Sequence, residues 1–166
     1  MNPISIINNV LNSNIVDEDY FAIKVLYDSS IENTKYVGFY FDDTDLLEFS
    51  VDKNTNIIKK FQLVVCNHFK LFDEDLLPAS SFEEGCIAFN LPPHNDCDVF
   101  KAHIYNNAVK IILSSKPVCK IIKCGQVLFG LSKEDNLVDV SVAEMSAQNI
   151  SHTIKELSLE TENEFQ

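Results

Sequence analysis

Clustered carboxylates are the most prominent groups in this sequence that could do chemistry. The chain has 25 acidic residues against 13 lysines and no arginine, for a net charge of −12. Such unbalanced charge costs self-repulsion, but it favours solubility and fast capture of a cationic partner. The sequence therefore predicts electrostatic binding. The acids form three clusters: Asp42, Asp43 and Asp45; Asp73, Glu74 and Asp75; and Glu83 with Glu84.

The charge is distributed unevenly along the chain. Residues 17–98 hold 17 acids and 6 lysines, residues 99–132 hold 5 lysines and no acid, and residues 133–166 hold 8 acids and 2 lysines. The lysine-only stretch is either the part of a sheet against which the acidic tail or the 67–85 segment docks, or a cationic binding face. Direct nucleic-acid binding is disfavoured, because it relies on cations that displace counterions from phosphates. Docking on an anionic membrane is disfavoured for the same reason.

The other reactive side chains form no recognisable catalytic motif. The sequence has no Gly-x-Ser-x-Gly elbow and no glycine-rich phosphate loop. Cys119 and Cys124 are separated by an odd offset on a predicted strand, so they would face opposite sides and could not share a metal ion. We therefore expect no catalytic residue, no metal site and no cofactor. The metal candidates considered are His94, Asp96, Cys97, Cys119 and Cys124.

Most of the chain has the alternation and the β-branched and aromatic composition of strands. Asp- and Asn-rich segments between them are typical of turns closed by their own side chains. Short helices are predicted over residues 3–12, where Pro3 could start a helix, over 68–77, and near the C-terminus, where Ile150, Ile154 and Leu157 share a helical face. Strands are predicted over 20–27, 36–41, 46–51, 57–66, 86–91, 98–105, 108–114, 118–124, 126–131 and 136–142.

These elements predict an α+β fold, mainly an antiparallel twisted β-sheet with short peripheral helices. Residues 1–158 are expected to form a single globular domain, and 159–166 an acidic, frayed C-terminal tail. The chain begins without a signal-peptide pattern, has no apolar run of 18 residues, and has five cysteines without disulfide spacing. We therefore expect a cytoplasmic location.

One internal similarity is visible. Residues 44–51 align without gaps on residues 135–142, and each block follows an aromatic strand and an acidic turn. Two copies of one hairpin in one sheet would explain this similarity. It is also what any turn followed by an amphipathic strand looks like.

The segment YVGFYFDDTDLLEFSVD at 36–52, continuing through NTNIIKK at 54–60, is similar to hairpins common in immunity proteins of bacterial contact-dependent growth inhibition and other polymorphic toxin systems. Small, acidic, strand-rich chains without catalytic motifs also resemble this class. The resemblance implies a non-enzymatic antitoxin that binds one cognate basic toxin, often a nuclease domain, and blocks its active site or its access to a partner. The class has no universal motif, so no functional residue is transferred from it.

The expected contact residues are six clustered acids for which we predict exposure. A protein-interaction or structural subunit of a phage or secretion assembly is an alternative that a hydrophobic interface would favour. A third interpretation, a hydrolase, would be favoured by a deep polar pocket holding an acid with a raised pKa. The six predicted partner-binding residues are Asp42, Asp43, Asp45, Asp73, Glu74 and Asp75.

Overall fold

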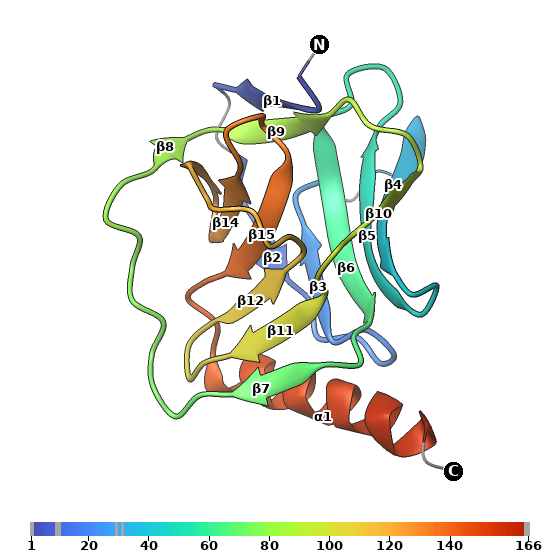
Figure 1. Ribbon diagram of the computed structural model, residues 1–166, viewed down its shortest axis with the longest axis vertical. Helices are drawn as coiled ribbons and strands as arrows, with labels where there is room; N and C mark the ends of the chain where they lie inside the picture. The colour runs from blue at the N-terminus through green and yellow to red at the C-terminus, as the bar shows by residue number, and fades with distance from the viewer. Residues whose placement is uncertain (1, 9–10, 29, 31, 165–166) are drawn as a thin grey trace.

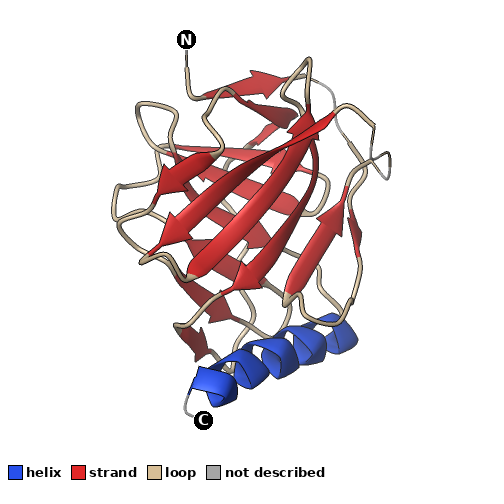
Figure 2. Cartoon of the chain, turned by 90° about the vertical axis from the view of Figure 1, so that its right-hand side faces the viewer, coloured by secondary structure: helices blue, strands red, loops and turns tan. Residues whose placement is uncertain are grey.

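The computed structural model describes residues 2–8, 11–28, 30 and 32–164. These residues form mostly strands in three sheets, with one helix, so the broad β-rich α+β class is as predicted. Two large sheets face each other, and their strands run in different directions (Figure 1, Figure 2). No helix in the described part of the chain is long and apolar enough to span a membrane.

The first large sheet has the strand order β10-β4-β5-β6-β3-β2. Its neighbouring strands are antiparallel, except for the parallel pair β10–β4 at one edge. The strands are β2 (Asn14–Ile15), β3 (Ile23–Leu26), β4 (Thr34–Phe41), β5 (Asp45–Asp52), β6 (Ile58–Val65) and β10 (His94–Asp96).

The second large sheet has the order β7-β11-β12-β15-β14-β13-β8. It is antiparallel except at its two edges, where β7–β11 and β13–β8 are parallel. The strands are β7 (Phe69–Leu71), β8 (Glu83–Glu84), β11 (Lys101–Ile104), β12 (Val109–Ile112), β13 (Lys120–Cys124), β14 (Val127–Leu131) and β15 (Leu137–Val142).

The third sheet, β1 (Ile4–Ile7) with β9 (Cys86–Phe89), lies across one end of the molecule, at the top of Figure 1. All four residues of β9 are buried. The segment that runs from β8 through β9 to β10 connects the β8 edge of the second sheet to the β10 edge of the first sheet. β8 has two residues and β10 has three. Because these edge strands are so short, they leave few free backbone groups to which a strand of another molecule could pair.

The two large sheets share one topology. In each, a hairpin (β2–β3 or β11–β12) is followed by a three-strand meander (β4–β5–β6 or β13–β14–β15). The last strand of each meander pairs with the second strand of the hairpin, as β6 with β3 and β15 with β12. The first strand of each meander pairs with a parallel edge strand, as β4 with β10 and β13 with β8. This repeat equates β5 with β14. The hairpins noted in the sequence, β4–β5 and β14–β15, lie in separate sheets, so the expectation of one shared sheet is wrong.

Two of the predicted helices are also wrong. Residues 4–7 form β1, because their Ile-rich sequence pairs with β9, and Asn90 N–H donates to Pro3 O (2.8 Å). Residues 9 and 10 of that prediction lie outside the described residues. Residues 69–71 form β7 on the edge strand β11, and the following segment is irregular. In both cases pairing with a distant strand overrides a weak local helix pattern.

The predicted C-terminal helix is present and longer than expected, α1 (Ala147–Glu164). Its start is capped reciprocally: Asn149 N–H donates to Ser146 Oγ, and Ser146 N–H donates to Asn149 Oδ1, both at 3.1 Å. Ile150 and Leu157 are buried, and Thr153 Oγ1 donates to Ala22 O (2.7 Å). The tail predicted at 159–166 begins inside this helix, and residues 165–166 lie outside the described part.

The core contains phenylalanine rings from all three sheets. Phe49 of β5 is fully buried, with its ring centroid 4.6 Å from Phe89, 5.3 Å from Phe61 and 6.5 Å from Phe129. Phe89 belongs to β9 and Phe129 to β14. Such tilted and edge-on pairs add to the stabilisation from burial alone.

We predict that Phe49→Ala lowers the free energy of unfolding by about 3–5 kcal/mol, because it leaves a cavity where the three sheets meet. Leu77→Ala, at a side chain that is 84% exposed, should change it by less than about 0.5 kcal/mol. Chemical denaturation followed by circular dichroism measures both. Equal effects would show that Phe49 is not central to the packing.

Candidate functional site

The first acidic cluster lies at the hairpin turn between β4 and β5. Asp42 and Asp43 have positive φ angles (50° and 58°), and Thr44 N–H donates to Phe41 O (3.1 Å). A turn with left-handed central residues fits the twist of the flanking strands, and Asp tolerates this conformation better than most residues do. The carboxylates of Asp42 and Asp43 are exposed as a consequence.

Asp45 differs from the other predicted contact residues because it is only 1% exposed. Its Oδ1 accepts the backbone N–H of Asn67 at 2.8 Å, which ties the turn to the segment after β6. The prediction that Asp45 is exposed is therefore wrong. Asp45 begins β5, and the turn geometry directs it inward while its two neighbours face solvent.

The second cluster follows β7. Backbone hydrogen bonds fix its path: Phe72 N–H donates to Ile104 O (2.8 Å), Asn106 N–H to Glu74 O (2.9 Å), and Leu76 N–H to Asn107 Oδ1 (2.9 Å). The backbone is thus anchored to the β11–β12 hairpin while the acidic side chains remain exposed. The three exposed acids are Asp73, Glu74 and Asp75.

Two exposed leucines flank this second cluster. Leu71 is 54% exposed and Leu77 is 84% exposed. The helix predicted over 68–77 rested on the spacing of Phe69, Phe72 and Leu76 and took no account of these two leucines. The Asp-rich segment before Pro78 is typical of a loop and was the signal that could have revealed them. Exposed leucines beside exposed acids are suited to contact with another protein.

The carboxylates of the five exposed acids have no counter-charge at bonding distance among the described residues. Among the described residues, none of their carboxylates forms an ion pair or a hydrogen bond. The two clusters lie on different sides of the molecule: in Figure 1 the β4–β5 turn is at the right-hand edge and the segment after β7 is at the lower left. The acidic surface is defined here as Asp42, Asp43, Asp73, Glu74 and Asp75.

The lysine-only stretch serves largely as a docking surface within the fold. Lys110 pairs with Asp139 (3.6 Å) and Lys120 with Asp135 (3.5 Å). The ammonium of Lys123 lies 5.2 Å from the centre of the Phe82 ring, and β8 pairs with β13 beside it. The expectation that the 67–85 segment docks here is confirmed for β8.

Cys86 and Cys124 are buried side by side between β9 and β13. The neighbouring Cys124 thiol and burial raise the pKa of Cys86, whereas the Cys86 thiol lowers the pKa of Cys124 to about 7. The raised pKa suppresses the reactive thiolate of Cys86. Across the described ranges, no three His, Cys, Asp or Glu side chains gather closely enough to hold a metal ion.

Asp139 is the acid in this fold whose environment comes nearest to the hydrolase interpretation. It is 8% exposed, and burial raises its pKa despite the opposing charge of Lys110. It lines a cavity of about 180 Å³ with Ser141 and Lys110, but the remaining lining is mainly apolar and includes no second carboxylate. Gly130 makes room for the carboxylate, because a Cβ there would lie 2.3 Å from Asp139 Oδ1.

Comparisons with known proteins do not assign this chain to a family. No family model matches the chain, and no curated protein matches it significantly.

We predict that Asp45→Ala destabilises the protein by about 1–3 kcal/mol, because the part-buried N–H of Asn67 loses its acceptor. Asp73→Ala should change the free energy of unfolding by no more than about 0.5 kcal/mol. Urea denaturation of both variants tests this difference between two acids that the sequence treats alike. A negligible effect at Asp45 would contradict the structural role given to it.

Asp139 should also impose a pH dependence on stability. Since the native state raises its pKa, the native protein holds this proton over a pH range in which the unfolded chain, with an ordinary pKa near 3.9, has lost it. The stability of the wild type relative to Asp139→Asn should therefore decrease as pH rises from about 3 to about 6. Denaturation curves of both proteins across this range measure it. A difference that grows with pH would contradict the assigned shift.

Proposed function

We propose that this protein is a non-enzymatic immunity protein that binds and neutralises a basic toxin domain in the cytoplasm. The observation that carries the proposal is the acidic surface, five exposed carboxylates without an ion pair among the described residues. A binding partner with complementary charge would supply the missing counter-charges.

Charge and apolar contact would act at different stages of binding. Unpaired surface charge accelerates encounter with an oppositely charged protein, and this effect weakens with salt. The exposed leucines at 71 and 77 could then be buried at short range, where apolar contacts contribute most to affinity. A nuclease domain fits such a surface, because the cations that hold its phosphate substrate are the groups that the acids would cover.

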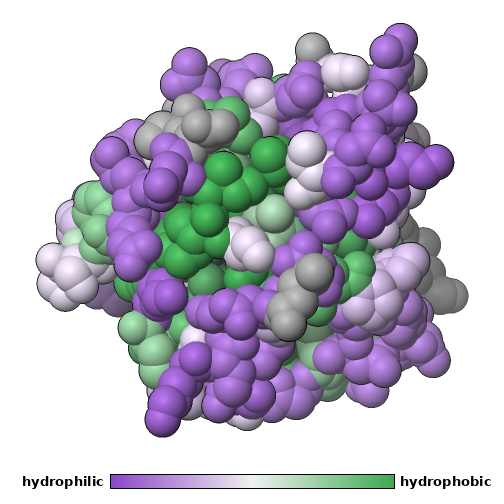
Figure 3. Space-filling view, turned by 90° about the horizontal axis from the view of Figure 1, so that it is seen from above, coloured by the Kyte–Doolittle hydropathy of each residue, from purple (hydrophilic) through white to green (hydrophobic). Residues whose placement is uncertain are grey.

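A structural subunit remains the second candidate, and one feature favours it. Seen from the end that carries β1 and β9, the surface has a continuous apolar area surrounded by hydrophilic side chains (Figure 3). Ile6 and Ile7 of β1 are only half-buried. An assembly through this area would depend little on salt.

We predict that the acidic surface, rather than net charge, determines partner binding. The test variant carries Asn at 42, 43, 73 and 75 and Gln at 74. The matched control carries Gln at five other exposed glutamates, with the same change in net charge, at 32, 83, 84, 134 and 144. The association rate at low salt should fall at least about ten-fold for the test variant and much less for the control.

The tagged chains are first used to capture partners from the native host across a salt gradient, with identification by mass spectrometry. The expected result is one basic protein, toxic when expressed alone, that binds the wild type and the control. Variants with only 42–43 or only 73–75 neutralised show whether both clusters contact it. Equal retention by the test variant would contradict the acidic site. Capture of only the chain itself, independent of salt, would favour the structural subunit.

A further inference from the structure

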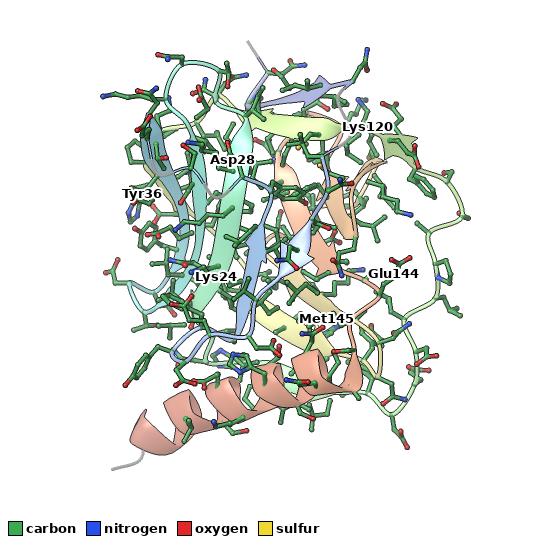
Figure 4. All side chains as sticks on the ribbon, turned by 180° about the vertical axis from the view of Figure 1, so that it is seen from behind. Lys24, Asp28, Tyr36, Lys120, Glu144 and Met145 are labelled. Carbon is green, nitrogen blue, oxygen red and sulfur yellow. The ribbon has the colours of Figure 1, made fainter. Side chains whose placement is uncertain are left out.

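A cavity of about 230 Å³ lies on the outer face of the first sheet and is lined by three lysines in an otherwise acidic protein. Figure 4 shows three residues that line it on this side of the molecule: Lys24 on β3, Asp28 just after it and Tyr36 on β4. The floor follows one row of paired residues across the sheet, from Leu26 through Lys60 and Ser50 to Tyr36.

A β-bulge adds the second lysine of this floor. Ser50 pairs with Lys60 and the next residue, Val51, pairs with Ile58, so Lys59 is the extra residue in β6. A bulge redirects a side chain that regular alternation would place on the opposite face. Lys59 and Lys60, although adjacent in the sequence, therefore both line the same cavity. Alternation alone would have placed one of them in the core.

Lys59 is the unusual charge in this group because it is only 6% exposed. Its Nζ donates to Glu32 O (2.6 Å) and Thr34 Oγ1 (3.2 Å), both neutral acceptors. Within the described ranges it takes part in no ion pair. A buried ammonium without a counter-ion is costly, and such groups are normally paired.

The other charges around the cavity come from two more lysines and three acids. Lys60 forms no ion pair with a described residue, and Lys24 pairs with Glu18. Asp28 also lines the cavity, where its Oδ1 accepts the N–H of Ser30 (2.9 Å). Asp52 is also near enough for the charge of Lys59 to help lower its pKa, after the larger effect of the Thr55 and Asn54 N–H groups. The three lysines therefore face three acids, Glu18, Asp28 and Asp52, but none of these carboxylates forms an ion pair with Lys59 or Lys60 among the described residues.

We propose that this cavity binds a small oxyanion, with a phosphate group as the best match. Ammonium groups act as point charges for phosphate oxygens. Lys59 and Lys60 would provide them from the bulge, and the hydroxyls of Thr34, Ser50 and Tyr36 line the same space as further donors. The anion would give the buried Lys59 a counter-charge at contact distance. This site lies outside the acidic surface and does not depend on the proposed immunity role.

The test is a titration of the 15N-labelled protein with inorganic phosphate, with sodium acetate and sodium chloride at matched ionic strength. Amide shifts should change on β3, β5 and β6 with phosphate, less with acetate, and not with chloride. Lys60→Gln should weaken the apparent affinity by about ten-fold, as expected for loss of a charged hydrogen-bond donor. Lys59→Met should weaken it at least as much.

Lys101→Gln is the matched control, because Lys101 is exposed on β11 of the other sheet. It should bind phosphate as the wild type does. If Lys59→Met fails to fold, Lys60→Gln decides the question alone. Equal affinity of Lys60→Gln and the wild type, equal shifts with chloride, or shifts confined to the second sheet would overturn the proposal.

Discussion

The packing of phenylalanine rings between the sheets is the contact on which the rest of this structure depends. Phe49, Phe89 and Phe129 come from three different sheets, and Phe49 lies within 6.5 Å of both partners between ring centroids. Neither large sheet can bury its inner face by itself, so each needs the other. Once these rings face inward, strand alternation fixes which residues of every strand face outward. The surface charges are placed by this apolar constraint rather than by their own attraction.

Turn geometry then sorts neighbouring acids into different roles. Asp42 and Asp43 occupy left-handed positions at the tip of the β4–β5 hairpin and remain in solvent, whereas Asp45 is buried and accepts a backbone hydrogen bond from Asn67. A charge in water contributes a long-range field, and a buried carboxylate contributes to stability only through its hydrogen bonds. Counting clustered charges in a sequence therefore overestimates how many of them a partner can reach. In the first cluster the count is too high by one residue, Asp45.

The sequence predicts the features that depend on local patterns. The meander over 36–66 and the C-terminal helix were visible because alternation, turn residues and the Ile150–Leu157 stripe are short-range signals. Strand β1 was missed because its stability comes from β9, which lies far along the chain. The repeat of topology was missed for the same reason, and the local similarity of 44–51 to 135–142 pointed to the wrong strands. Of the candidate site, five acids were placed correctly on the surface. The flanking leucines were missed although the Asp-rich segment before Pro78 indicates a loop, and the bulged Lys59 depends on strand pairing that no local pattern encodes.

A strongly acidic protein and an oxyanion cavity are compatible because the two kinds of electrostatic interaction have different ranges. The field of exposed carboxylates is screened over about 8–10 Å at physiological salt, so it governs encounter between macromolecules. Lys59 acts at contact distance in a partly enclosed space, where screening by salt is weaker. The net charge of −12 thus repels large polyanions such as nucleic acids without excluding a small anion that can enter the cavity. Capture of a protein by the acidic surface should consequently be far more sensitive to salt than occupancy of the lysine-lined cavity.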